Sequence, residues 1–537
     1  MIKTKLLYQF LLNVVSFIFG PLLLLNIFSE SHFQFHVLGF IVSLFGFFLY
    51  FRAITDILHF GQGFPLFGLF PKRLVNQGLY TNNRHPIIWA TLLYILGLLM
   101  SYSLDYATIT ILLSMTFILL TTYTKIMIDR KLLRLFNEDF ITYKNSVPFL
   151  KWKFIKSSDI KISLAHQIVW FFSVIFFSIK YRISVTGFHH IPLKPPFVVV
   201  APHQCYFDPF LFGGFIPYKV HYITTADVFK SKFLKFGLDA IGTIPIRRHV
   251  QDLKAIRKML NLVKRGQPVG IFPEGGRTMD GRPLEIAPET IKFIQKCNAP
   301  ILPLKMKGAF EIWPRWSKVR RSGKVEIEFQ PVIPVEDQGD LDTLTKRIKS
   351  SIFYDETNYS PTTSKRRGHG LNELLWSCPE CHENDTIQSD GKMSISCRHC
   401  HEQWDVSPKL HLIGKQSFTI ASWLDTIRSD ISPLKSFDPE YDFEPDENAY
   451  LFSDVLSYII DDEVITTENL SLMMTNKNIV LFQNTKVLEI FPFQGITYFS
   501  KDFHHKLSIA LKRIRYTFAL QKTDIQMKWF DYFNKLK

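Results

Sequence analysis

The chain has 537 residues, of which 47% are hydrophobic and 15% are aromatic, and its formal net charge is +15. This length is sufficient for three or four domains, and the apolar content argues against a wholly soluble protein. A basic excess favours an anionic partner, which is either nucleic acid or the cytoplasmic surface of a membrane. Because the cations are dispersed around apolar segments, we expect membrane lipids as partners and no nucleic-acid binding.

Four long apolar runs in the N-terminal part predict four transmembrane helices, since about 20 apolar residues cross a bilayer. The first run has no small-residue cleavage site and is too long for a removable signal peptide. Lysine and arginine precede the first run, separate the second from the third and follow the fourth, whereas the other two loops carry neither. The positive-inside rule therefore places both ends of this unit in the cytoplasm. The runs are residues 6–28, 36–51, 87–101 and 106–123.

A later apolar segment, residues 162–179, has lysine or arginine close to both ends. Cations on both sides favour a helix embedded in one leaflet over a fifth span. The chain after this segment therefore stays on the cytoplasmic side.

Four short blocks follow one another in the middle of the chain. The first places His203 and Asp208 five positions apart, directly after the strand-like segment 197–200. The second is a strand-like run that ends in two arginines, the third reads Phe-Pro-Glu-Gly-Gly-Arg, and in the fourth prolines bracket a short apolar strand. A histidine beside an aspartate is more often structural than catalytic, so the other blocks carry the argument. The blocks are residues 203–208, 242–248, 272–277 and 300–304.

The order and spacing of these blocks resemble the lysophosphatidic acid acyltransferase family, also called the glycerophospholipid acyltransferases. The resemblance implies an α/β domain that moves a fatty acyl group from acyl-CoA or acyl carrier protein to a lysophospholipid hydroxyl. Imidazole is a suitable base for that hydroxyl near neutral pH. We predict that His203 takes the proton while Asp208 holds the other ring nitrogen, and that the lipid is the nucleophile. Cys205 and Gly276 replace the family's usual serine and threonine, but neither change removes a group that this mechanism requires.

The phosphate of such an acceptor needs positively charged side chains to bind it. Arg248 and Arg277 stand at the family's motif positions, and a guanidinium matches phosphate oxygens with two parallel hydrogen bonds. The alternative is that both are surface arginines at strand ends. We expect Glu274 to anchor its loop or an acceptor hydroxyl, and Gly275 to let the backbone approach the ligand.

The N-terminal unit has a resemblance of its own, to the isoprenylcysteine carboxyl methyltransferase and phospholipid methyltransferase family. Residues 74–86 carry it, and the family implies that Arg84 and His85 help hold S-adenosylmethionine. Ile88 replaces an expected tyrosine, and of an expected pair of glutamates the chain keeps one carboxylate, Asp129. The unit is therefore either a methyltransferase or a membrane anchor derived from that fold. Binding of S-adenosylmethionine that is lost in His85→Ala would favour the first.

Two Cys-x-x-Cys pairs separated by fifteen residues predict a zinc ribbon, because four thiolates at this spacing close a tetrahedral site. Four protein ligands leave no position for water, so we expect the zinc to be structural and coupled to folding. Disulfides are the alternative, which a cytoplasmic location disfavours. We expect the ribbon to contact a protein or to act as a spacer. The ligands are Cys378, Cys381, Cys397 and Cys400.

The last segment alternates apolar and polar residues in short runs, which predicts an antiparallel sheet. A terminal helix follows, with Trp529 and Phe533 on one face. Strands closed by one helix look like the pleckstrin-homology-like or GRAM superfamily, which implies that the domain holds membrane lipid or a partner; a self-packed barrel is the alternative. The strand-like runs are 470–474, 479–482, 487–491, 507–511 and 514–520.

The predicted chain is thus multidomain: a four-helix transmembrane unit, an α/β acyltransferase domain, a small zinc ribbon and a C-terminal antiparallel β domain closed by a helix. We expect an integral membrane O-acyltransferase of a bacterial inner membrane, with catalytic and C-terminal domains in the cytoplasm and 1-acyl-glycerol-3-phosphate as acceptor. The alternatives are a bifunctional acyltransferase and methyltransferase, or a non-enzymatic membrane scaffold. The predicted boundaries are a membrane domain at 1–155, the acyltransferase domain at 160–355, linkers at 356–370 and 413–455, the ribbon at 371–412 and the β domain at 456–537.

Overall fold

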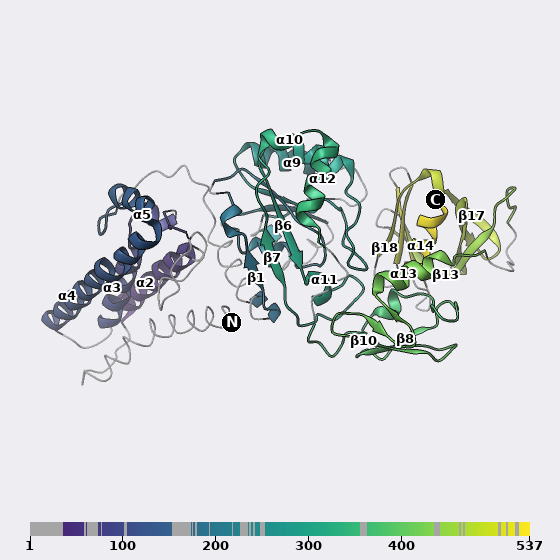
Figure 1. The fold of residues 1–537 in the computed structure, drawn as a ribbon, viewed down its shortest axis with the longest axis horizontal. Coiled ribbons are helices and arrows are strands. Elements are labelled where there is room, and N and C mark those ends of the chain that lie inside the picture. Colours follow the sequence, from purple (N-terminus) through teal and green to yellow (C-terminus); the bar gives the residue numbers. More distant parts are fainter. Residues whose placement is uncertain are drawn as a thin grey trace. The chain divides into compact units, whose positions relative to one another are not determined.

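The computed structural model divides into two compact units, residues 1–175 with 214–218 and residues 176–213 with 219–537, which we treat separately (Figure 1). The structure describes residues 36–57, 61, 73–76, 78–100, 105–152, 173, 176–177, 180–192, 194–216, 218–225, 235, 238–239, 242–246, 253–354, 362–433, 441–460, 463–465, 468–502, 506–511, 514–520 and 526–537. Its 3₁₀ turns are η2 Gly78–Thr81, η4 Phe188–His190, η6 Val335–Asp337, η7 Leu371–Glu373 and η8 Phe493–Gly495.

Three apolar helices and one amphipathic helix make up the described part of the first unit. Helices α2 and α3 pack closely at two glycines: a Cβ on Gly46 would lie 2.4 Å from the Tyr94 backbone nitrogen, and one on Gly97 would lie 2.3 Å from that of Ser43. Glycine is needed at both positions because any side chain would separate the helices. The helices are α2 Val37–Asp56, α3 Pro86–Leu99 and α4 Tyr106–Tyr123, which continues through the π-helical turn η3 Thr124–Ile128 into α5 Asp129–Ser146.

The predicted four-helix transmembrane unit is not confirmed, although three of its four apolar runs are helical. Runs 36–51, 87–101 and 106–123 are helices α2, α3 and α4. Among the residues that the structure describes, two helices, at Val37–Ile54 and Tyr106–Ser146, are long and apolar enough to cross a membrane, while Pro86–Leu99 is shorter. The first predicted span, 6–28, lies outside the described residues, as does nearly all of the predicted interfacial helix 162–179.

The middle of the chain folds around a seven-stranded sheet with strand order β1-β7-β6-β2-β5-β3-β4. Strand β2 lies between β5 and β6 and runs parallel to both, whereas β6 and β7 pair in antiparallel direction. The strands predicted at 197–200 and 300–304 are confirmed as β2 and β6. The strands are β1 Ser184–Thr186, β2 Val198–Val200, β3 His221–Thr225, β4 Ile244–Ile246, β5 Val269–Ile271, β6 Ile301–Lys307 and β7 Glu326–Phe329.

Three amphipathic helices, α9, α10 and α12, share a core with this sheet and lie near one another in Figure 1. In α12, Leu344, Ile348 and Ile352 recur at helical spacing and are fully buried, and the same core includes Val198 and Val200 of β2. The strand that precedes His203 is therefore fixed by packing. The helices of this part are α7 Asp208–Gly213, α9 Leu253–Lys264, α10 Pro288–Lys296, α11 Ala309–Ile312 and α12 Leu341–Ile352.

A five-stranded antiparallel sheet follows, in which β9 ends at Cys397, and it leads into helix α13, Ile420–Ser429. The predicted linker 413–455 is therefore wrong over much of its length. Helix α13 has a Thr419–Ser422 capping box, buries Trp423 and Leu424, and belongs to the same core as the ribbon. The predicted linker 356–370 is also wrong from Thr362 on, because Thr362 is 2% exposed and hydrogen-bonded. The strands are β8 Ile387–Ser389, β9 Ser394–Cys397, β10 Gln403–Val406, β11 Leu412–Ile413 and β12 Ser417–Phe418.

The C-terminal part is an antiparallel sheet with strand order β17-β16-β15-β13-β20-β19-β18, with β14 paired to β13. The five predicted strand runs are confirmed, and helix α14 buries Trp529 and Phe533 as predicted. The predicted start at 456 is wrong, because β13 begins at Ala449. The elements are β13 Ala449–Ile460, β14 Glu463–Ile465, β15 Leu470–Thr475, β16 Asn478–Gln483, β17 Lys486–Pro492, β18 Ile496–Asp502, β19 Lys506–Leu511, β20 Ile514–Leu520 and α14 Gln526–Leu536.

Candidate acyl-transfer site

Two loops at the same edge of the sheet carry the predicted site residues. His203 comes directly after β2, and Glu274 follows β5. Since β2 and β5 are neighbouring parallel strands, their carboxyl ends meet, and this edge is where open α/β sheets bind ligands. The first and third sequence blocks therefore meet in the fold, although His203 and Glu274 are 71 positions apart.

His203 and Asp208 form the predicted pair. The Nδ1 atom of His203 lies 2.7 Å from Oδ2 of Asp208, and Asp208 is fully buried at the start of α7. The same carboxylate accepts hydrogen bonds from the backbone N–H groups of Gln204 at 2.7 Å and Cys205 at 3.0 Å. These bonds hold the carboxylate in place, and a carboxylate beside Nδ1 favours the neutral tautomer with its proton on Nδ1, which leaves the lone pair of Nε2 to accept a proton.

Glu274 anchors its loop to the backbone of His203. Its Oε2 atom accepts from the His203 N–H at 2.6 Å, and its Oε1 atom accepts from the Leu284 N–H at 3.0 Å. The Thr278 N–H donates to the His203 carbonyl at 3.1 Å, so the loop binds both sides of this residue. Of the two roles expected for Glu274, these contacts favour the anchor.

Burial sets the protonation of the site. It lowers the pKa of His203, which the hydrogen bond and charge of Asp208 partly oppose, so the imidazole is a neutral base near pH 7. Burial raises the pKa of Glu274 to about 7 against the effect of its two backbone donors. Burial also raises the pKa of the Cys205 thiol, so a thiolate nucleophile is disfavoured there.

Arg277 lies over the ring of Tyr206, with its guanidinium carbon 3.4 Å from the ring centre. The residue is 7% exposed, and its Nη1 atom is buried without a hydrogen-bond partner in the described part of the chain. A buried guanidinium donor without an acceptor is costly, and an anionic ligand would supply the acceptor. Arg248, the other predicted phosphate ligand, lies outside the described residues.

Gly275 has a φ of 66°, and a Cβ at this position would meet nothing within 4 Å. Glycine is favoured at this position because the backbone is left-handed. The open space beside it would let a ligand approach the backbone. The sequence reasoning missed Thr278 and Leu284, because they act through backbone N–H groups that every residue type carries.

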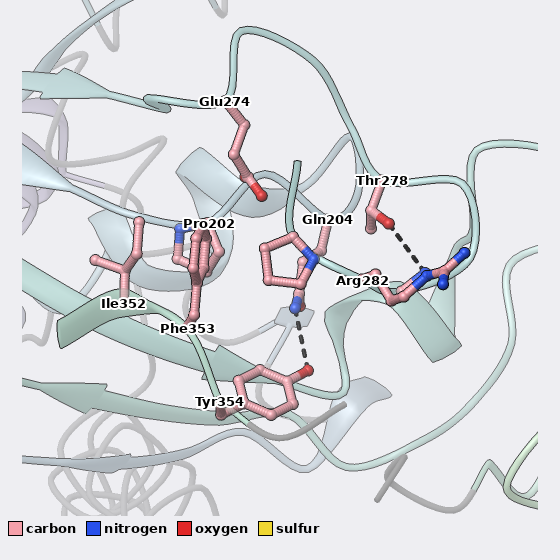
Figure 2. Close-up of a pocket in the computed structure, with 10 residues that line it drawn as sticks. Pro202, Gln204, Glu274, Thr278, Arg282, Ile352, Phe353 and Tyr354 are labelled. Atoms are coloured by element: carbon pink, nitrogen blue, oxygen red, sulfur yellow. Dashed lines mark hydrogen bonds between the residues drawn. The ribbon is translucent and has the colours of Figure 1, made fainter. Parts of the chain in front are cut away.

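A small pocket lies beside the candidate base, lined by Gln204, Glu274, Arg282 and the end of α12 (Figure 2). Gln204 donates from Nε2 to the Tyr354 hydroxyl at 3.1 Å, and its Oε1 atom is buried with no partner among the described residues. His203 does not line this pocket, and its side chain is 24% exposed.

The N-terminal residues singled out from the sequence also meet. His85 Nε2 lies 2.8 Å from Asp129 Oδ1, and Arg84 Nη2 lies 3.8 Å from Asp129 Oδ2. Asp129, the one carboxylate that the chain keeps of the expected pair, therefore contacts both Arg84 and His85. Binding of S-adenosylmethionine at Arg84 and His85 stays a prediction.

The four predicted zinc ligands lie within 4.8 Å of one another, and none of them is in a disulfide. The Sγ atoms of Cys378 and Cys400 are 3.7 Å apart, as are those of Cys381 and Cys397. Ligands about 2.3 Å from a tetrahedral zinc lie about 3.8 Å from one another, so the cluster fits the metal.

Comparison with known proteins indicates an acyltransferase domain in the middle of the chain. Residues 182–307 match the family model described as Acyltransferase. The matched segment contains His203, Asp208, Glu274 and Arg277, and it extends from the start of the sheet to the end of β6.

Relatives of this domain include two proteins named 1-acyl-sn-glycerol-3-phosphate acyltransferase. The chain is 30% identical over 132 residues to the 1-acyl-sn-glycerol-3-phosphate acyltransferase of Bacillus subtilis, covering 24% of this chain and 65% of that protein. It is 24% identical over 194 residues to 1-acyl-sn-glycerol-3-phosphate acyltransferase alpha of Bos taurus, covering 35% of this chain and 67% of that protein. The chain thus spans less than two thirds of the Bacillus subtilis relative.

A solved structure is also similar. The crystal structure of the 1-acyl-sn-glycerophosphate acyltransferase PlsC from Thermotoga maritima is 20% identical, with a TM-score of 0.33, and the match covers 44% of this chain and 93% of that one.

Proposed function

We propose that the chain is a membrane-bound O-acyltransferase that transfers a fatty acyl group to a lysophospholipid, with 1-acyl-glycerol-3-phosphate as the first candidate acceptor. The observation that supports this most is the His203–Asp208 pair, held at the carboxyl edge of the sheet beside a buried arginine with an unpaired donor. The matched relatives act on the same class of acceptor by their names.

In the proposed reaction, Nε2 of His203 removes the proton from the acceptor hydroxyl as the oxygen attacks the thioester carbon. Asp208 stabilises the imidazolium that forms. When the carbon–sulfur bond breaks, the imidazolium returns the proton to the departing thiolate, which leaves as a thiol. No covalent acyl-enzyme is required, because the lipid hydroxyl is itself the nucleophile.

In this proposal Arg277 binds the acceptor phosphate, and Arg248 is the second predicted phosphate ligand. The acyl donor is acyl-CoA or acyl carrier protein, and the apolar helices of the N-terminal unit hold the enzyme at the membrane that contains its acceptor. We place the site on the cytoplasmic side, where both donors occur.

Labelled acyl-CoA and acyl-loaded carrier protein, each offered with lysophosphatidic acid and lysophosphatidylcholine, test this function. We expect the full-length protein in membranes to form a labelled diacyl lipid from lysophosphatidic acid. Absence of product with both donors and both acceptors would contradict the proposal and favour the non-enzymatic scaffold.

The pH dependence of the reaction should follow Glu274. Both of its oxygens accept a backbone N–H, and these hydrogen bonds are strongest when the carboxyl group is ionised, so we expect kcat/KM to rise with pH through about 7. His203 does not cause this rise, because its lowered pKa leaves it neutral there. In Glu274→Gln, kcat/KM should instead rise at a lower pH, below about 6.5, where His203 loses its proton. A pH profile that is the same in this variant would show that another group sets it.

We propose that the four cysteines hold a structural zinc. The free energy of zinc binding would then contribute to the folding free energy of the ribbon. Metal analysis of the purified protein should find one zinc per chain, and Cys378→Ser should lose it and lower the melting temperature. Cys297→Ser is the matched control, since Cys297 is a buried cysteine on the acyltransferase domain. A full-length protein that folds equally well with and without zinc would contradict this role.

The C-terminal sheet and its closing helix are proposed to form a pleckstrin-homology-like domain that contacts membrane lipid or a protein partner. Its antiparallel strand order and the buried face of α14 support this assignment. In the full-length protein, slower hydrogen exchange of strands β13 to β20 and helix α14 in vesicles of anionic lipid than in vesicles of neutral lipid would support lipid contact; equal exchange would oppose it.

A further inference from the structure

The loop that carries Glu274 and Arg277 holds the candidate base through its backbone. We call residues 274–284 the clamp loop. His203 donates to Glu274 and accepts from Thr278, and Glu274 in turn accepts from Leu284 at the end of the loop. The position of His203 relative to a bound acceptor therefore depends on the conformation of the whole clamp loop.

Arg282 connects the clamp loop to another part of the fold. Asp280 accepts from Arg282 at Nε, 2.9 Å, and at Nη2, 2.6 Å. The guanidinium also donates from Nη1 to Oδ2 of Asp425 at 2.8 Å and from Nη2 to Oδ1 of Asp425 at 2.9 Å. This is a two-point contact between planar groups, which fixes direction as well as distance.

Asp425 stands on α13, and α13 is fixed to the zinc ribbon. Its inner face is buried, and the indole of Trp423 donates to the carbonyl of Ser377 at 3.0 Å, directly before the metal ligand Cys378. A second connection runs through Trp316, whose indole donates to the Met279 carbonyl of the clamp loop at 2.9 Å. Trp316 and Met279 belong to the same hydrophobic core as the ribbon and α13.

We propose that the ribbon and α13 position the clamp loop for acyl transfer, with Asp425 as a positioning residue that acts through Arg282. This inference rests on the proposed function, since acyl transfer is the activity that the loop serves. The ribbon is then a part of the acyltransferase that orders its acceptor site, beyond the spacer or recruitment role expected from the sequence.

The Asp425–Arg282 pair suits a test because it is exposed. Arg282 has 39% of its side chain exposed and Asp425 has 57%. An exposed ion pair contributes little to overall stability, so changes at Asp425 leave the fold intact while they release the loop.

Asp425→Lys places a second cation opposite Arg282. We expect kcat/KM for lysophosphatidic acid to fall about tenfold, which corresponds to a loss of about 1.4 kcal/mol, while KM for the acyl donor and the melting temperature stay unchanged. Asp425→Glu keeps the carboxylate and should retain most of the activity. Asp405→Lys, a change of the same charge at an exposed position on β10, is the matched control and should behave as wild type.

Hydrogen exchange gives a readout that does not depend on catalysis. Amides of residues 274–284 should exchange faster in Asp425→Lys than in wild type or in Asp405→Lys. Faster exchange together with reduced acceptor kcat/KM would support the inference. Unchanged exchange, or faster exchange with unchanged kinetics, would overturn it. If wild type shows no acyl transfer at all, the proposed function fails, and the exchange result alone decides whether α13 holds the loop.

Discussion

His203→Ala is expected to lower acyl transfer by about a thousandfold, because the variant lacks the base that takes the acceptor proton. The change should leave folding and membrane association intact. The imidazole lies at an open face, stacked on Phe272 with the ring centres 4.4 Å apart, and its removal leaves the buried carboxylate of Asp208 with its backbone donors. The measurement is the single-turnover rate with saturating donor and acceptor in membranes of matched protein content.

His189→Ala is the control for this experiment, since His189 is an exposed histidine in the same domain. Its rate should equal that of wild type. Substantial turnover by His203→Ala would mean that another group is the base, and the mechanism proposed from the His203–Asp208 geometry would fail.

Arg277→Ala is expected to reduce kcat/KM for lysophosphatidic acid by about one hundredfold, because it removes a buried cationic donor for the phosphate. The loss should be mainly in the acceptor KM. For monoacylglycerol, which has no phosphate, kcat/KM should fall far less. The quantity to measure is therefore the ratio of kcat/KM for lysophosphatidic acid to kcat/KM for monoacylglycerol. Arg277→Lys should restore part of the difference, since lysine keeps the charge but not the planar pair of donors.

Arg347→Ala supplies the matched control, because Arg347 is an exposed arginine on α12 that pairs with Asp337. Equal losses with both acceptors in Arg277→Ala would show that the arginine supports the loop, through its contact with Tyr206, and does not bind phosphate.

Local patterns in the sequence were sufficient for much of the fold. Strands β15, β16, β17, β19 and β20 and the helix α14 were predicted because their alternating or helical spacing of apolar residues decides which face is buried. Helix α13 lies in a segment predicted to be a linker, although Ile420, Trp423, Leu424 and Ile427 stand at helical spacing behind a threonine cap. An acidic segment with two prolines, residues 438–446, follows this helix and favours a linker.

The sequence predicts the parts of the candidate site that depend on the type of side chain. The pair of His203 and Asp208 follows from residue types five positions apart, and the cysteine cluster follows from its spacing. The clamp loop depends instead on backbone donors and on a contact between Arg282 and Asp425, which are 143 positions apart. No local pattern encodes such a contact, so the structure was needed to find it.

The most direct test of the account is the formation of labelled phosphatidic acid from labelled acyl-CoA and lysophosphatidic acid by the full-length protein, with His203→Ala measured beside it. The account predicts a diacyl product in wild type and a rate about a thousandfold lower in the variant. Equal product formation by both proteins would contradict it.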